Sequence, residues 1–131
     1  MKILQVSSHY FPLVGGVQVH VRNISERLAR KHDVTVFTSD RTGKLPQEED
    51  INGVLVRRFK CYGRNKVDGV SFGMLRELRR SEFDVVHGHN YHALSLLFST
   101  YAWKRKFVVT PHYHRHGMTP LIDMLVKLLD Y

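Results

Sequence analysis

The stretch KILQVSSHYFPLVGGVQVHVRNISERLARKHDVTVFTS, residues 2–39, contains two apolar runs with an amphipathic segment between them. Residues 2–6 and 33–39 are short, apolar and rich in β-branched side chains, which is typical of buried strands. In the segment between them, apolar side chains recur at helical spacing and share one face, namely Val17, Val21, Ile24 and Leu28. This pattern predicts a strand, a helix that starts near Gly16, and a second strand.

The rest of the chain continues the alternation of strands and helices. Further strands are expected at 83–89 and 107–110, and further helices at 72–81, 93–106 and 119–131. The strands are continuous apolar runs, which is typical of a parallel sheet covered on both faces. We therefore expect an α/β fold with a Rossmann-like, doubly wound and mostly parallel sheet.

The Asn52-Gly53 dipeptide is a strong turn signal between two short runs. It predicts a hairpin formed by residues 47–51 and 54–59. The alternative is that the second of these runs joins the main sheet after a long loop.

The length and charge of the chain limit the kinds of partner that it can bind. The 131 residues are enough for one domain with a real core. Twenty Lys and Arg against twelve Asp and Glu give a net charge of +8, which favours anionic partners: nucleic acid, phosphorylated metabolites or an acidic membrane face. A solvated basic surface without such a partner explains the charge equally well. We expect no nucleic acid, because the basic residues are spread over several helices and no aromatic stacking platform is visible.

The expected location is the cytoplasm. Cys61 is the single cysteine, so no internal disulfide can form and a reducing compartment is the default. The opening run MKILQVSSHYFP is too short and polar for a signal peptide. No stretch approaches the ~20 apolar residues that a membrane span needs.

Histidines gather where the predicted strands end, and ligands of open α/β sheets bind outside the carboxyl ends of the strands. Six of the nine histidines follow such strands, with Asn90 beside them: His9, His87, His89, His112, His114 and His116. His20 lies one turn past the Gly15-Gly16 turn and can face the same cleft. A single strand-end histidine is more often structural, but a group of neutral imidazoles with Asn90 suits a hydroxyl-rich substrate.

The Gly15-Gly16 turn has two readings. Glycines here permit a positive φ and let the backbone approach a ligand closely, and the N–H groups that start the helix would face an anion. The dipeptide by itself favours the simpler interpretation, a tight corner between strand and helix, because Gly-Gly pairs are common.

The H-x-H pairs at 87–89 and 112–114 could also bind zinc. Apart from Asp84, no acidic residue accompanies these histidine-rich tips, so we expect no metal and no other cofactor. A metal-dependent hydrolase remains the less favoured enzymatic alternative.

Taken together, these segments resemble the retaining, GT-B-fold glycosyltransferases of family 4. The resemblance begins with the first strand, the aromatic-Pro loop, Gly15-Gly16, a histidine four residues later and HDVTVFT. It continues in the same order over essentially the whole chain, through NGVLVRR (52–58), FDVVHGHNYHALSLL (83–97) and FVVTPHYH (107–114).

The resemblance implies the acceptor-side, N-terminal half of a GT-B enzyme, which moves a sugar from a nucleotide-diphosphate sugar to an acceptor hydroxyl with retention. It implies that Gly15 and Gly16 approach the donor phosphate or the acceptor, and that His112 contacts the transferred sugar or positions the acceptor. His20, His87 and His89 match positions that line or support the same cleft. The acceptor would be a sugar or a lipid-linked molecule, met in the cytoplasm or at an acidic inner membrane face.

One departure from the family pattern concerns the second domain. In the family, a C-terminal domain carries a basic pair and two spaced glutamates that hold the nucleotide-sugar, and residues 1–131 offer no counterpart. We therefore expect residues 1–131 to be an incomplete N-terminal domain that is inactive alone. A non-catalytic Rossmann-like binding module is the alternative. Residues 119–131 are apolar on more than one helical face, which predicts a homodimer through this helix.

Overall fold

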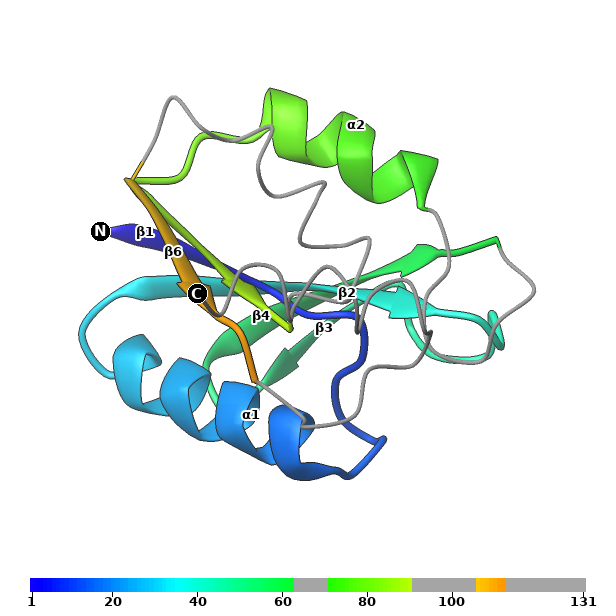
Figure 1. Cartoon of the computed structure of the whole chain (residues 1–131), viewed down its shortest axis with the longest axis horizontal. Helices are drawn as coiled ribbons and strands as arrows, with labels where there is room; N and C mark the ends of the chain where they lie inside the picture. Colours follow the sequence, from blue (N-terminus) through cyan, green and yellow to red (C-terminus); the bar gives the residue numbers. More distant parts are fainter. Residues whose placement is uncertain (63–70, 91–105, 113–131) are drawn as a thin grey trace, which may run out of the picture.

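A computed structural model describes residues 1–62, 71–90 and 106–112. Its centre is a six-stranded sheet with the order β3-β4-β2-β1-β5-β6 (Figure 1). All neighbouring strands are parallel except β3 and β4. The strands are β1 (Lys2–Val6), β2 (Asp33–Asp40), β3 (Glu48–Ile51), β4 (Val54–Lys60), β5 (Val85–His89) and β6 (Lys106–Thr110).

The two described helices cover opposite faces of this sheet (Figure 1). Helix α1 (Gly16–Ala29) follows β1 and buries Val21 in a core cluster with β1, β2 and β4. Helix α2 (Phe72–Arg80) buries Met74 and Leu78 in a second cluster with β1, β2 and β5. The expected α/β, Rossmann-like and mostly parallel architecture is confirmed.

Strand alternation assigns polar residues to one of these two faces. Leu4 of β1 and Val86 of β5 are register partners, and both pack in the α2 cluster. Because successive side chains of a strand point to opposite faces, Gln5, His87 and His89 lie on the face that α1 covers. The spacing of the H-x-H pair thus places both imidazoles on one side of the sheet.

Both arrangements considered for the segment around Asn52-Gly53, a hairpin and a strand of the main sheet, are present in the structure. Asn52 and Gly53 have φ values of 54° and 81°, and the Gly53 N–H donates to Asp50 Oδ1 at 2.9 Å. Strand β3 pairs antiparallel with β4 across this turn, while β4 also pairs parallel with β2. The hairpin is therefore present, and its second strand belongs to the main sheet.

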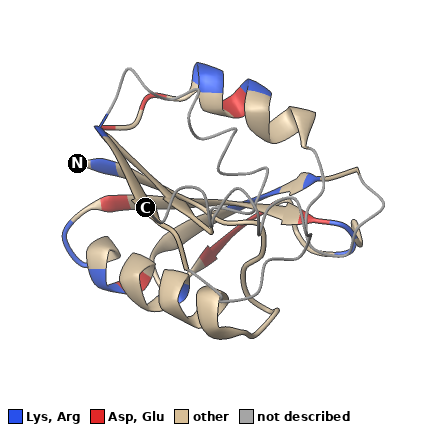
Figure 2. Cartoon of the chain, in the orientation of Figure 1, with Lys and Arg blue, Asp and Glu red and all other residues tan. Residues whose placement is uncertain are grey.

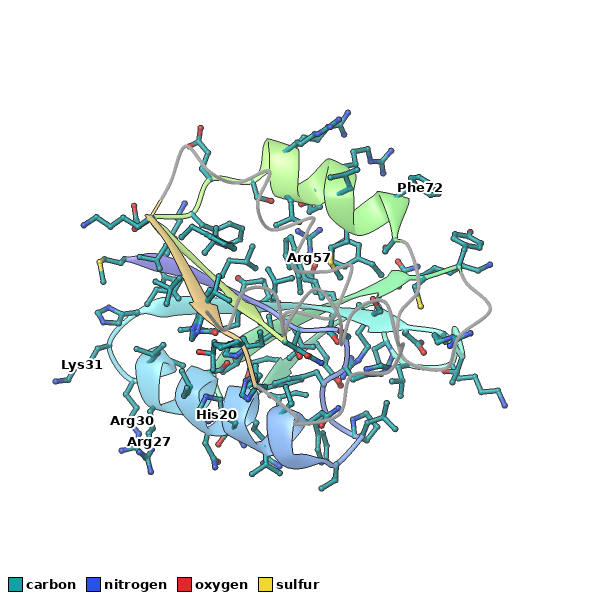
Figure 3. All side chains as sticks on the ribbon, in the orientation of Figure 1. His20, Arg27, Arg30, Lys31, Arg57 and Phe72 are labelled. Atoms are coloured by element: carbon teal, nitrogen blue, oxygen red, sulfur yellow. The ribbon has the colours of Figure 1, made fainter. Side chains whose placement is uncertain are left out.

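Positive charge is spread around the described part of the molecule (Figure 2). Arg27, Arg30 and Lys31 project outward at the C-terminal end of α1 (Figure 3). This end lies away from the carboxyl edge of the parallel strands, because α1 runs back toward the start of β2. Arg57 is held by Glu48 at 3.0 Å and Glu77 at 2.5 Å. These three basic side chains are thus distant from the edge where a ligand is expected, and Arg57 is paired with two carboxylates.

The expected helix 119–131 and the predicted dimer contact lie outside the described residues. The expected helix 93–106 lies outside them as well, except for Lys106, which is the first residue of β6 and not the end of a helix. Among the residues that are described, no helix has both the length and the apolar composition needed to cross a bilayer.

Candidate functional site

Four histidines meet on the α1 face at the carboxyl ends of β5 and β6. His20 reaches them from α1 (Figure 3), and its ring centroid lies 4.9 Å from that of His112 and 6.0 Å from that of His89. The rings of His87 and His89 are 4.0 Å apart between centroids. The structure therefore brings together the four cleft histidines that the sequence analysis singled out.

Hydrogen bonds fix the orientation of the central ring. His89 Nε2 lies 2.6 Å from Gln5 Oε1, and His89 Nδ1 lies 3.2 Å from His112 Nε2. An amide oxygen only accepts, so the Nε2–H of His89 is the donor and its Nδ1 accepts from the Nε2–H of His112. In the neutral tautomer that this chain of bonds selects, Nδ1 of His112 carries the lone pair. His87 is held separately, with Nε2 2.8 Å from Thr110 Oγ1.

Burial keeps two of these imidazoles neutral. It lowers the pKa of His89 to about 3, and the neighbouring His87, His112 and His20 oppose its protonation further. Burial is also the main reason that the pKa of His87 is lowered. Neutral imidazoles can exchange hydrogen bonds with hydroxyl groups but cannot act as counter-ions for a phosphate.

The backbone is left-handed at two residues that follow β5 and β6. Asn90 has a φ of 68° and His112 a φ of 47°. The Asn90 N–H donates to the carbonyl of Thr110 at 3.0 Å, which ties the ends of the two strands together. Positive φ is uncommon outside glycine and gathers at functional sites, where the surrounding structure holds it.

The Gly15-Gly16 turn differs from the expectation in one respect. Gly15 is extended, with φ −169° and ψ 172°, and the left-handed glycines of the described chain are Gly43 and Gly53. Positive φ therefore does not explain this pair. A Cβ on Gly15 would lie 2.5 Å from Gln18 Oε1, whereas a Cβ on Gly16 would meet nothing within 4 Å. The fold itself leaves the space beside Gly16 open.

The first turn of α1 is equipped for an anion. No side chain caps the helix, and its first turn contains no acidic residue. The first helical bond runs from the Val19 N–H to the Gly15 carbonyl, so the N–H groups of Gly16, Val17 and Gln18 have no partner within the helix. Such a terminus attracts negative charge through these N–H groups and the helix dipole.

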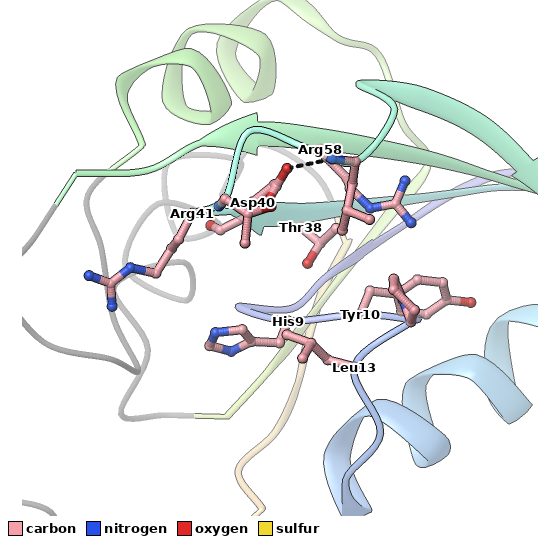
Figure 4. Close-up of a pocket in the computed structure, with 11 residues that line it drawn as sticks. His9, Tyr10, Leu13, Thr38, Asp40, Arg41 and Arg58 are labelled. Atoms are coloured by element: carbon pink, nitrogen blue, oxygen red, sulfur yellow. Dashed lines mark hydrogen bonds between the residues drawn. The ribbon is translucent and has the colours of Figure 1, made fainter.

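A cavity of about 300 Å³ opens at the carboxyl ends of β1 and β2 (Figure 4). Its walls come from the loop after β1, from the end of β2 and the turn beyond it, and from β4. The lining includes His9, Tyr10, Leu13, Thr38, Asp40 and Arg58. His9 thus belongs to this cavity.

Two buried polar residues hold the walls. The side chain of Arg58 is 2% exposed; it pairs with Glu49 at 2.5 Å and donates to the carbonyls of Pro46 and Phe11 at 3.1 and 2.8 Å. Asp40 accepts from the Thr42 hydroxyl at 2.7 Å and closes the following turn. Burial acts to raise the pKa of Asp40, but hydrogen bonds from Thr42 and the turn backbone lower it overall.

Thr38 offers the cavity an unused hydroxyl. The residue is 1% exposed, and its Oγ1 has no hydrogen-bond partner among the described residues. In Figure 4 the hydroxyl points into the space between Arg58 and the Tyr10 loop. The sequence pattern did not predict Thr38, Asp40 and Arg58 as site residues. The available signal was that polar residues continue the buried face of Val34, Val36, Val54 and Val56 where β2 and β4 end.

Of the three remaining candidate site residues, the structure describes one. Asn90 lies at the histidine cluster, and its Oδ1 is buried without a partner in the part of the chain that the structure describes. His114 and His116 lie outside the described residues.

The histidine cluster, the uncapped start of α1 and the cavity share one edge of a Rossmann-like sheet. Residues 14–129 match the model of Glycosyltransferase Family 4. The chain belongs to glycosyltransferase family 4. The resemblance noted from the sequence is thereby confirmed.

One curated relative and one solved structure extend this result. The GDP-mannose:cellobiosyl-diphosphopolyprenol alpha-mannosyltransferase of Komagataeibacter xylinus is 30% identical over 109 residues, which cover 79% of this chain and 26% of the relative. The sucrose-phosphate synthase of Thermosynechococcus elongatus is 15% identical, with a TM-score of 0.64 over 96% of this chain and 39% of that one. The chain therefore spans about a quarter of the length of the mannosyltransferase that it matches. The similarity to the sucrose-phosphate synthase shows the fold alone.

The first prediction concerns His89 and pH. Its pKa is about 3 in the folded chain, against about 6.5 when unfolded. As the pH falls, the unfolded chain takes up this proton first, so the free energy of unfolding should fall between about pH 6.5 and pH 3. The loss attributable to His89 is about 2 kcal/mol at pH 5 relative to pH 7.5.

Urea unfolding of the wild type and His89→Gln at these two pH values measures this loss, which the variant should lack. His32→Gln is the control and should keep the wild-type dependence. NMR titration of the His89 ring provides a direct check, and a midpoint near pH 6.5 would contradict the prediction.

Proposed function

We propose that this domain helps to transfer a sugar from a nucleotide-diphosphate sugar to an acceptor hydroxyl, with retention of configuration. In the reaction, the bond from the anomeric carbon to the diphosphate breaks, a bond to the acceptor oxygen forms, and the proton of the acceptor hydroxyl passes to the departing diphosphate. The observation that carries the proposal is the juxtaposition of the uncapped start of α1 with the histidine cluster. His20 links the two, since it lies one turn from Gly16 and contacts the ring of His112.

The start of α1 is proposed to receive the departing diphosphate. The N–H groups of Gly16 and its neighbours supply donors, and stabilising charge where it develops is a large contribution to catalysis. The open space beside Gly16 supports this role, because a phosphate oxygen can approach the backbone there. A nucleotide-sugar-binding C-terminal domain, as in the family's GT-B enzymes, would hold the rest of the donor.

His112 is proposed to position the transferred sugar. Its ring is oriented by His89, which Gln5 orients in turn. Such a relay fixes the direction in which His112 presents Nδ1 and suits hydrogen bonding to a sugar hydroxyl. Gly15, His87 and Asn90 support the same cleft.

The cavity beside Tyr10 is proposed to hold the acceptor. The curated relative is named for transfer to a cellobiosyl-diphosphopolyprenol, whose glycosyl part combines apolar ring faces with hydroxyl groups. The mostly apolar walls and the unpaired hydroxyl of Thr38 are complementary to such a ring. A lipid-linked acceptor would place the enzyme at the acidic cytoplasmic face of a membrane, which its charge of +8 favours.

Two further proposals concern the activity and the association of residues 1–131. Residues 1–131 are proposed to be inactive without the nucleotide-binding domain, and residues 119–131 to dimerise when that domain is absent. A non-catalytic binding module would share this site, and it is distinguished by the absence of turnover in the two-domain protein.

The second prediction tests the diphosphate site. Gly16→Val should leave the fold intact, because the space around a Cβ is open, but should lower kcat/KM for the nucleotide-sugar by at least tenfold by blocking the phosphate. Steady-state kinetics on the two-domain protein provide the measurement, with thermal unfolding to confirm folding. Gly73→Ala, at the start of α2 on the opposite face, is the matched control. A folded Gly16→Val enzyme with wild-type kinetics would refute the proposal.

The third prediction concerns His112. His112→Ala should lower the transfer rate by about 10²-fold, because the sugar loses a positioning contact. His32→Ala removes a histidine far from the cleft and should retain wild-type rates. Equal rates for the two variants in the same assay would remove His112 from the mechanism.

The fourth prediction concerns Thr38. Thr38→Val keeps the shape but deletes a buried, unpaired hydroxyl, so the free energy of unfolding should stay equal or rise. The KM for the acceptor should nevertheless increase several-fold, while the KM for the nucleotide-sugar is unchanged. Thr35→Val, at a half-buried position on the same strand, is the control. An unchanged acceptor KM would show that the acceptor binds elsewhere.

A further inference from the structure

We infer that His20, His89 and His112 form a binding site for a divalent transition-metal cation of the Zn²⁺ class. One ring nitrogen from each residue lies within 4.8 Å of the others. Imidazole nitrogen is a favoured ligand for this class, and three histidines that leave a fourth position open make a recurrent zinc arrangement.

The His89–His112 pair already has the spacing of two ligands. His89 Nδ1 and His112 Nε2 are 3.2 Å apart. Two nitrogens bound tetrahedrally at about 2.0–2.1 Å from zinc are separated by about 3.3 Å. A cation can therefore bind both nitrogens at this separation once the rings turn so that their lone pairs converge on it, and the proton on His112 Nε2 moves to Nδ1 of that ring.

The surroundings of His89 match those of a metal-bound imidazole. Its Nε2–H donates to Gln5 Oε1 at 2.6 Å, which leaves the Nδ1 lone pair as the coordinating atom. Metal-binding histidines commonly donate their second ring N–H to an oxygen in this way, which fixes tautomer and orientation. His89 is 0% exposed, so its ring is held in place before a cation arrives.

His20 completes the set from the solvent side. It is exposed and lies on α1, so its side chain has room to rotate toward the other two nitrogens. The site therefore opens to solvent at His20 and is anchored in the core at His89. The fourth coordination position would be taken by water or by an oxygen of a bound ligand.

This site differs from the zinc alternative weighed in the sequence analysis. Sequence spacing singled out two H-x-H pairs, and their lack of acidic partners argued against a metal. The geometry takes one histidine from each pair and adds His20, while His87 is bonded to Thr110. The absence of carboxylates is no obstacle, because three neutral imidazoles suffice as ligands.

A bound cation and a sugar would both require His112. The cation is therefore expected to compete with substrate and inhibit transfer. The binding site itself does not depend on the proposed glycosyl transfer.

The fifth prediction is tested by equilibrium dialysis of the 131-residue chain, without an affinity tag, against Zn²⁺ at pH 7.5. The wild type should bind about one equivalent. His20→Ala, which removes an exposed side chain and leaves the core intact, should weaken binding by at least about tenfold. His112→Ala should do the same, and His32→Ala is the matched control that should bind as the wild type does.

The visible spectrum of the Co²⁺-loaded chain identifies the ligands. A tetrahedral spectrum without thiolate charge-transfer bands is expected, and it should disappear in His20→Ala. The inference is overturned if the chain binds no stoichiometric Zn²⁺, or if His20→Ala and His112→Ala retain wild-type affinity. It is also overturned if the bands show sulfur ligation by Cys61.

Discussion

One buried hydrogen bond, from His89 Nε2 to Gln5 Oε1, determines the geometry of the site. Both side chains are 0% exposed and lie on neighbouring strands inside the sheet. The bond satisfies His89 Nε2 and Gln5 Oε1, and leaving such buried polar atoms unpaired would cost about 1–3 kcal/mol. Gln5 Nε2 is buried without a partner among the described residues, so the amide is only half satisfied. The bond uses Nε2, so Nδ1 of His89 faces His112, and the orientation of that residue follows. The proposed sugar positioning and the proposed cation binding both depend on this arrangement.

The hydrophobic core sets the register that makes this bond possible. Leu4 and Val86 are partners across β1 and β5, and both pack against α2. A slip of one residue in β5 would move His87 and His89 to the α2 face and bury apolar side chains on the wrong side. The pattern that stabilises the fold therefore also selects the face on which the histidines meet α1.

Local signals in the sequence predicted the elements, and non-local contacts decided the site. The strand at 2–6, the helix start at Gly16 and the Asn52-Gly53 hairpin each depend on neighbouring residues, and each is present. The edge that gathers the histidines was also predictable, because parallel strands share a carboxyl end. Gln5 as the partner of His89 was not, since 84 residues separate them and the contact requires β5 to lie beside β1. Thr38 was missed for the same reason, because its cavity depends on Arg58 and the Tyr10 loop.

The loop between β1 and α1 links the cavity to the start of α1. At one point it lines the cavity, and the Phe11 carbonyl accepts from the buried guanidinium of Arg58. Arg22 of α1 lies over the Phe11 ring at 4.9 Å, so the same residue is also held by the helix. Five residues later the loop ends at Gly16, where α1 begins. Phe11 is therefore held both by β4, through Arg58, and by α1, through Arg22. These two contacts fix the start of the segment that runs from the cavity to the first turn of α1.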